Sequence, residues 1–169
     1  MDTLPNRKPT RLPGYDYSQA NCYFVTICTA GKKNILGDIR RGDPCGRPEW
    51  IPTALGIIAE KNIACTEEKF GIAISPYVIM PNHIHLMISL LGQRATARVA
   101  PTLSQIIGAY KSKVSYDYLQ LCKKNNTQMG TLWQRSYYDH VIRNEADYLR
   151  IWQYIDENPA KWTEDEYYM

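Results

Sequence analysis

The chain has 169 residues, of which 44% are hydrophobic and 22% are charged, and its formal net charge at pH 7 is +3. This length suits one compact domain, and the longest apolar runs are far shorter than the roughly 20 residues of a membrane-spanning helix. The five cysteines form no CxxC pair, which argues against a zinc knuckle and a disulfide framework. We therefore expect a cytoplasmic protein with a single domain, residues 21–169, and no membrane segment.

The first third of the chain predicts an arm, a strand and a loop. Residues 1–20 hold three prolines among basic residues, a composition typical of an extended basic arm. Residues 21–29, NCYFVTICT, are rich in β-branched and aromatic side chains and predict the first strand. Residues 37–52 contain three glycines and three prolines without usable periodicity, so we expect a long loop there.

The middle of the chain predicts a helix followed by a hairpin. Thr53 can cap a helix that runs to about Thr66, because apolar residues recur there at helical spacing. Residues 71–80 and 83–91 are strand-like segments on either side of a Pro-Asn turn. Two such strands joined by a turn dipeptide predict a β-hairpin.

The last third predicts a helix over residues 103–121, a short strand over residues 137–143 and a final helix. Asn144 can cap this final helix, which ends by Pro159. The order strand, helix, strand, strand, helix, strand is the split βαβ arrangement. We therefore expect an α+β, ferredoxin-like βαββαβ sandwich with an antiparallel sheet, two helices on one face, the other face open, and a C-terminal helix.

Two of the three histidines, His83 and His85, stand in the middle of the strongest strand pattern. Alternate side chains of a strand share a face, so both imidazoles lie opposite the apolar Ile84 and Leu86. We expect the pair on the open face with Cβ atoms roughly 6–7 Å apart, which lets two ring nitrogens bind one divalent ion. An HxH pattern alone is weak evidence for a metal site, because two partly buried, hydrogen-bonded structural histidines explain it more readily.

Two segments resemble the signatures of HUH single-tyrosine transposases. In residues 77–90, YVIMPNHIHLMISL, a Met-Pro-Asn turn precedes His, a hydrophobic residue and His, as in the metal-binding strand of that family. Residues 132–162 resemble its second signature, a helix that presents the nucleophile in a Tyr-Ile-x-x-Asn-Pro context, and here that tyrosine is Tyr154. The resemblance is strongest to REP-associated tyrosine transposases and their insertion-sequence relatives, and it extends over most of the chain.

The final helix can present Tyr154 and Asn158 in the same direction, because they lie about one helical turn apart. An adjacent apolar stripe is suited to docking on the sheet: Tyr148, Ile151, Trp152 and Ile155. The resemblance implies that Asn158 completes a metal site with His83 and His85. Because Asn158 precedes Pro159, we expect its backbone to leave helical angles.

The resemblance implies an enzyme that cuts and rejoins single-stranded DNA. Tyr154 would attack the phosphodiester to give a 5′-phosphotyrosine and a free 3′-hydroxyl. Mg²⁺ or Mn²⁺ would polarise the phosphate, and mixed nitrogen and oxygen ligation suits Mn²⁺ somewhat better. The family's association with imperfect palindromes implies a hairpin substrate, and we expect a homodimer, with a monomer left open because relatives include both.

Contacts with single-stranded DNA need cations along the backbone and aromatic faces for the bases. The candidate cations are Arg7, Lys8, Arg11, Lys111, Lys113 and Arg135. Each of them is explained equally well as a solvated surface residue.

Three other functions stay open from the sequence. A ferredoxin-like module that binds single-stranded nucleic acid without chemistry would stack bases on aromatic side chains, where this chain has histidines. A small-ligand or zinc-binding domain would need a cysteine or a further histidine in register. An HUH replication initiator shares the transposase chemistry, although its tyrosine context and its size usually differ.

Overall fold

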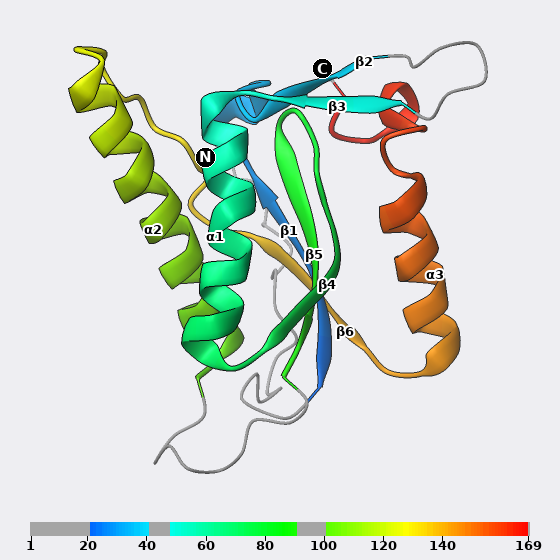
Figure 1. Cartoon of the computed structure of the whole chain (residues 1–169). Helices are drawn as coiled ribbons and strands as arrows, with labels where there is room; N and C mark the ends of the chain where they lie inside the picture. Colours follow the sequence, from blue (N-terminus) through cyan, green and yellow to red (C-terminus); the bar gives the residue numbers. More distant parts are fainter. Residues whose placement is uncertain (1–20, 41–47, 91–100, 169) are drawn as a thin grey trace, which may run out of the picture.

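The computed structural model describes residues 21–40, 48–90 and 101–168 (Figure 1). The expected arm, residues 1–20, lies outside these ranges, and so do the candidate DNA contacts Arg7, Lys8 and Arg11. Within the described ranges, no helix combines the length and the hydropathy needed to cross a membrane.

Four strands form one antiparallel sheet in the order β4-β5-β1-β6. They are β1 (Cys22–Cys28), β4 (Ala73–Ile79), β5 (His83–Ser89) and β6 (Tyr138–Ile142). The predicted hairpin is β4 with β5, and the strand of residues 21–29 becomes β1 at the centre of the sheet. With a helix after β1 and another after β5, this order confirms the ferredoxin-like βαββαβ fold.

Helices α1 (Ala54–Phe70) and α2 (Leu103–Lys124) cover one face of the sheet (Figure 1). The side chains of Thr53 and Thr102 accept hydrogen bonds from backbone N–H groups of the first turns, and the sequence predicts this N-cap role for Thr53. Helix α1 continues beyond Thr66 and ends at Gly71, whose φ of 62° is a left-handed conformation that favours glycine. The main core lies between these helices and alternate residues of the central strands.

Helix α3 (Glu145–Glu157) covers the opposite face of the sheet (Figure 1). Its N-cap is Asn144, as predicted, and its buried residues Ile151 and Ile155 pack in a second core against Phe24, Met87 and Ile142. The expectation of an open face was therefore wrong, because removing these apolar groups from water favours docking of α3 on the sheet. Only half of the predicted apolar stripe is buried, since Tyr148 and Trp152 remain 36% and 44% exposed.

A two-stranded antiparallel hairpin, β2 (Gly37–Arg40) with β3 (Glu49–Pro52), replaces the loop predicted for residues 37–52. Each strand has only four residues, too few for a period-two pattern to stand out among the glycines and prolines. The hairpin packs on the start of α1, where the Trp50 side chain and the Leu36 carbonyl lie against Gly56. Short 3₁₀ turns occur at η1 (Ala30–Lys32) and η2 (Trp162–Glu164).

Candidate active site

His83 and His85 stand side by side on β5, with their ring centroids 4.4 Å apart. They share the sheet face that α3 covers, as strand alternation predicts. Their exposed fractions are 0% and 1%, so the expectation of exposed imidazoles was wrong. Helix α3 and residues 162–168, which we call the C-terminal segment, enclose the pair: Tyr154 of the helix and Tyr167 of the segment both contact the rings.

Each imidazole is oriented by a hydrogen bond at Nδ1. His83 Nδ1 donates to Asn82 Oδ1 at 2.8 Å, since an amide oxygen can only accept. His85 Nδ1 lies 2.9 Å from Thr26 Oγ1 on the neighbouring strand β1. These bonds direct the Nε2 atoms toward the enclosed space, and His83 Nε2 is buried there without a hydrogen-bond partner. A partner that fixes Nδ1 while Nε2 faces the site is the arrangement of metal-binding histidines.

Burial keeps both histidines neutral. It lowers the pKa of His83 to about 4, against the opposing influence of the Asp165 carboxylate. The pKa of His85 is held well below its ordinary value by burial and by the neighbouring His83. Because a metal binds the neutral imidazole, both side chains are in the form that can donate a nitrogen lone pair.

Tyr154 projects from α3 toward the histidines. Its phenolic oxygen lies 3.2 Å from His85 Nε2, and its ring meets Phe24 edge-on at 5.9 Å between centroids. The side chain is 39% exposed, so one part of it contacts the histidine while another faces solvent. Burial raises the pKa of Tyr154, and the nearby Asp165 and Glu166 carboxylates raise it further. The phenol is therefore neutral in the free protein.

Asn158 lies about one helical turn after Tyr154, and both residues line a cleft in the surface of the protein. Its backbone has φ −56° and ψ −43°, so the expectation that Pro159 forces it out of helical angles was wrong. The preference imposed by proline is overcome here because the Asn158 side chain is buried and its Nδ2 donates to Asp165 Oδ2 at 2.8 Å. Asn158 Oδ1 is buried without a partner.

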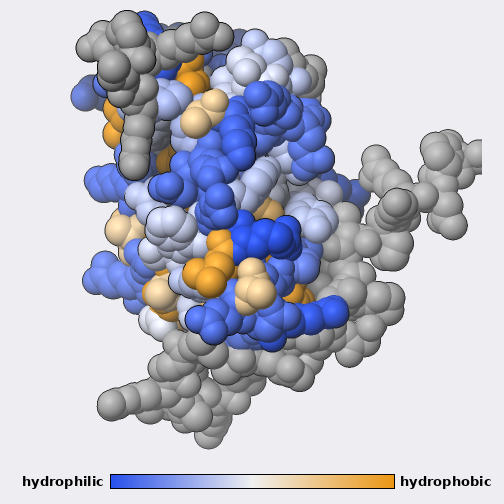
Figure 2. Space-filling model, turned by 90° about the vertical axis from the view of Figure 1, so that its right-hand side faces the viewer, coloured by the Kyte–Doolittle hydropathy of each residue, from blue (hydrophilic) through white to orange (hydrophobic). Residues whose placement is uncertain are grey.

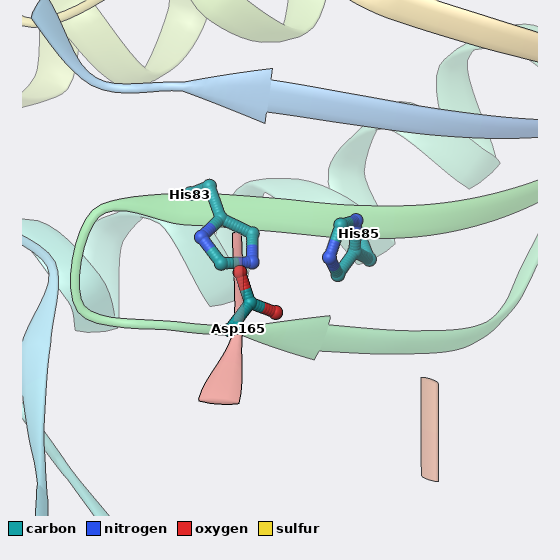
Figure 3. Close-up of side chains that lie close together, drawn as sticks. All are labelled: His83, His85 and Asp165. Carbon is teal, nitrogen blue, oxygen red and sulfur yellow. The ribbon is translucent and has the colours of Figure 1, made fainter. Parts of the chain in front are cut away.

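Asp165 is a candidate site residue that the sequence did not single out. One ligand atom from each of His83, His85 and Asp165 lies within 4.8 Å of the others, and the three could hold a metal ion. Figure 3 shows the carboxylate of Asp165 directed toward the two imidazoles. Asp165 follows both recognised signatures in a tail rich in acidic residues, where no spacing singled it out.

A cleft of about 710 Å³ opens beside Tyr154 between α3, β6 and the C-terminal segment. Its walls include the aromatic ring of Tyr138 and the cations Arg150 and Lys161, none of which the sequence singled out as DNA contacts. Arg150 pairs with Asp147, and Lys161 pairs with Glu157. Figure 2 faces this side of the molecule, where hydrophilic residues predominate around a few hydrophobic ones.

The predicted cations of the described ranges do not line this cleft. Lys111 donates to the Gln134 carbonyl at 2.6 Å, and partial burial lowers its pKa. Lys113 forms an i,i+4 ion pair with Asp117 on α2, and Arg135 is exposed. Their roles as DNA contacts stay predictions.

The donors at this site fit a divalent metal ion. Two neutral imidazoles and a carboxylate are the mixed nitrogen and oxygen set that Mn²⁺ and related ions accept. A cation between them would also give a partner to His83 Nε2, whose lone pair is otherwise buried and unsatisfied.

Comparisons with known proteins agree with this arrangement. The family model described as "Transposase IS200 like" matches residues 46–158, more than half of the chain. The chain belongs to the IS200-like transposase family. This confirms the resemblance to HUH single-tyrosine transposases, because the matched residues include His83, His85 and Tyr154.

This transposase also has relatives that match over most of its length. An uncharacterized protein of Haemophilus influenzae is 31% identical over 180 aligned positions, which cover 98% of this chain and 95% of the relative. A solved REP-associated tyrosine transposase bound to a REP hairpin has a similar fold, with a TM-score of 0.57, 18% identity, and coverage of 90% of this chain and 74% of its own. A candidate transposase of Deinococcus radiodurans gives a TM-score of 0.52 and 17% identity, with coverage of 87% and 95%.

Proposed function

We propose that this transposase cleaves and rejoins single-stranded DNA through a covalent bond to Tyr154, in a reaction that depends on a divalent metal ion. The observation that carries the proposal is the position of the Tyr154 phenol, 3.2 Å from His85 and beside an open cleft. Family membership supports the reaction class, and the geometry supports the choice of residues.

Cleavage of a phosphodiester requires a positioned nucleophile and neutralisation of the negative charge on the phosphate. The cleft leads a phosphate to the Tyr154 phenol, whose orientation Phe24 and His85 restrict. A divalent cation bound to His83 and His85 would neutralise charge on the phosphate as the phenolic oxygen attacks. The phenolic oxygen forms a bond to phosphorus as the bond from phosphorus to the 3′ oxygen breaks; the phenol gives its proton to water in the cleft, and the departing 3′ oxygen takes one up from water. The products are a 5′-phosphotyrosine and a 3′-hydroxyl, and reversal by a second 3′-hydroxyl rejoins the strand.

Mn²⁺ or Mg²⁺ is the proposed cofactor. Imidazole nitrogens suit Mn²⁺ somewhat better on ligand softness, whereas the carboxylate suits both ions. The pair of histidines alone brings no negative charge to balance a divalent ion, so an oxygen donor beside them supports the proposal.

The proposed substrate is a single strand next to a hairpin. A relative of the same fold was solved with a REP hairpin, and this supports a hairpin here. In this chain, Tyr138 offers a half-exposed ring for stacking, and Arg150 and Lys161 offer cations in the cleft wall. The 3.2 Å approach of Tyr154 to His85 of the same chain supports a site assembled within one subunit, and the homodimer stays a prediction.

The decisive test is covalent capture. The full chain is incubated with Mn²⁺ and a labelled oligonucleotide that carries a hairpin, and SDS-resistant protein–DNA adducts are counted. We expect Tyr154→Phe to abolish the adduct, because it removes only the nucleophilic oxygen. Tyr148→Phe is the matched control, since Tyr148 lies on the same helix and is exposed, and it should retain full capture.

Other outcomes of the capture experiment would favour the alternative functions. Adducts that persist in Tyr154→Phe would contradict the assignment of the nucleophile. DNA binding without any adduct in the wild type would favour a non-catalytic binding module. That alternative has little support from the fold, because Phe24 on the central strand β1 is 8% exposed beneath α3 and cannot stack bases. Capture of a replication-origin strand, with no capture of hairpin substrates, would favour a replication initiator.

A further inference from the structure

We propose that Asp165 supplies the third protein ligand of the metal site and that Asn158 positions it. The sequence resemblance had given the third place to Asn158. This inference rests on the proposed metal dependence, and it adds a ligand from the C-terminal segment, which lies beyond the matched residues 46–158.

The C-terminal segment holds Asp165 against the histidines. Trp162, 7% exposed, anchors its first turn, and the Asp165 carboxylate follows at the end of that turn. The Oδ1 atom of Asp165 accepts a hydrogen bond from Tyr167 N at 2.7 Å, and Oδ2 accepts one from Asn158 Nδ2 at 2.8 Å. Each oxygen keeps a further lone pair for a cation. These hydrogen bonds fix the direction of the carboxylate and still allow its oxygens to bind a cation.

The space between Asp165 and the histidines has the features of a cation site. His83 is fully buried, its Nδ1 is engaged by Asn82, and its Nε2 has no hydrogen-bond partner. A buried acceptor without a partner is costly, and here an Asp165 carboxylate oxygen lies within 4.8 Å of a ring nitrogen of His83. A divalent ion bound by the two atoms would satisfy the nitrogen and balance the carboxylate charge.

Charge and hydrogen bonding favour Asp165 over Asn158 as the ligand. Two neutral imidazoles and a neutral amide would leave a divalent ion without any anionic donor, whereas hard cations prefer carboxylate oxygens. Asn158 already directs its Nδ2 at Asp165. Its buried Oδ1 is the competing donor, and the variants below distinguish the two.

Asn82 links the metal site to the backbone of the C-terminal segment. Its Oδ1 accepts from His83, and its Nδ2 donates to the Tyr167 carbonyl at 2.8 Å. Lys32 Nζ donates to the adjacent Glu166 carbonyl at 3.2 Å. The residue that orients His83 therefore also holds the segment that carries Asp165. Metal binding and docking of this segment should stabilise each other.

The test measures Mn²⁺ binding to the full chain without DNA, by the loss of the electron paramagnetic resonance signal of free Mn²⁺. We expect Asp165→Asn to weaken binding by at least about tenfold, because the isosteric amide keeps the shape and removes the charge. Asp156→Asn is the matched control, an identical change at an exposed position of α3 outside the cleft lining, and it should bind as the wild type does. Circular dichroism without metal verifies that both variants are folded.

Two further variants separate the possible failures. Asn158→Ala should weaken binding less than Asp165→Asn, because it removes a positioning hydrogen bond and leaves the carboxylate. The reverse ranking, or wild-type affinity in Asp165→Asn, would overturn the assignment of Asp165 while leaving the histidine site intact. Wild-type affinity in His83→Gln would instead contradict the metal site itself, and with it the metal-dependent part of the proposed function.

Discussion

The phenolic oxygen of Tyr154 and the Nε2 atom of His85 lie 3.2 Å apart although 69 positions separate them along the chain. Docking of α3 on the sheet produces this proximity, because Ile151 and Ile155 of α3 are buried against Phe24 and Met87. Packing of the apolar side of α3 thus fixes the position and rotation of the helix on the sheet, and with them the placement of Tyr154 beside β5. Four predictions follow from this and related contacts.

Removal of divalent metal should stop cleavage. We expect EDTA to abolish covalent adducts with single-stranded DNA and excess Mn²⁺ to restore them, because a phosphate is a poor target until its charge is neutralised. The measurement is adduct yield on denaturing gels across a Mn²⁺ titration. Adduct yield that is indifferent to chelation would contradict the role given to His83 and His85.

Thr26→Val should weaken Mn²⁺ binding by about 10-fold to 100-fold, because the hydroxyl that orients His85 Nδ1 is lost while the side-chain shape is kept. Thr66→Val is the control: its hydroxyl bonds the Asn62 carbonyl inside α1, away from the site. The control should lose stability without losing metal affinity, as followed by urea unfolding and by metal titration. Equal effects of the two substitutions on metal affinity would argue against an orienting role for Thr26.

Gly56→Ala should destabilise the fold by about 1–3 kcal/mol or more, since the added Cβ would stand 1.9 Å from the Leu36 carbonyl oxygen. Gly108→Ala in α2 meets nothing within 4 Å and should stabilise by about 0.5–1 kcal/mol, because alanine favours a helix. Urea unfolding measures the free energy of unfolding, which should fall in Gly56→Ala and rise in Gly108→Ala. A neutral Gly56→Ala would mean that the hairpin is not packed against α1 as described.

Asp147 should contribute stability that acid removes. Hydrogen bonds from His140 and Arg150 lower the pKa of its carboxyl in the folded chain, so the folded state takes up this proton less readily than the unfolded state does. The contribution is complete above the ordinary pKa of 3.8 and is lost as pH falls through the lower folded value. The unfolding free energy of the wild type minus that of Asp147→Asn should therefore shrink between about pH 5 and pH 2. A constant difference over that range would contradict the ion pairing.

Local patterns predicted most of the fold because the elements concerned carry their own signals. Thr53 and Asn144 mark two helix starts, and each accepts the capping hydrogen bond in the structure. The hairpin of residues 37–52 was not predicted, because four-residue strands stabilised by contacts with α1 are too short to show a period-two pattern in the sequence. The burial of the histidines escaped for a similar reason: periodicity assigns a face to each side chain and says nothing about what later covers that face.

The candidate site was predicted in part. His83, His85, Tyr154 and Asn158 were identified by motif, and they line or approach one cleft. Asp165 was not identified, because it meets the histidines only through the path of the chain after α3. The cleft-wall cations Arg150 and Lys161 were missed likewise, since each resembles an ordinary surface charge in the sequence, the first on α3 and the second in the turn after it, and their shared wall exists only in three dimensions.

The contacts of the C-terminal segment bear on how the protein should be handled. The Glu166 and Tyr167 carbonyls are tied to Lys32 and Asn82, and the Tyr168 ring packs on Trp162 at 5.2 Å between centroids. A purification tag or immobilisation linker fused after Met169 would be joined four residues after Asp165, whose carboxylate faces the histidines. Metal affinity measured with this segment unmodified therefore reflects the contacts that hold Asp165 at the site.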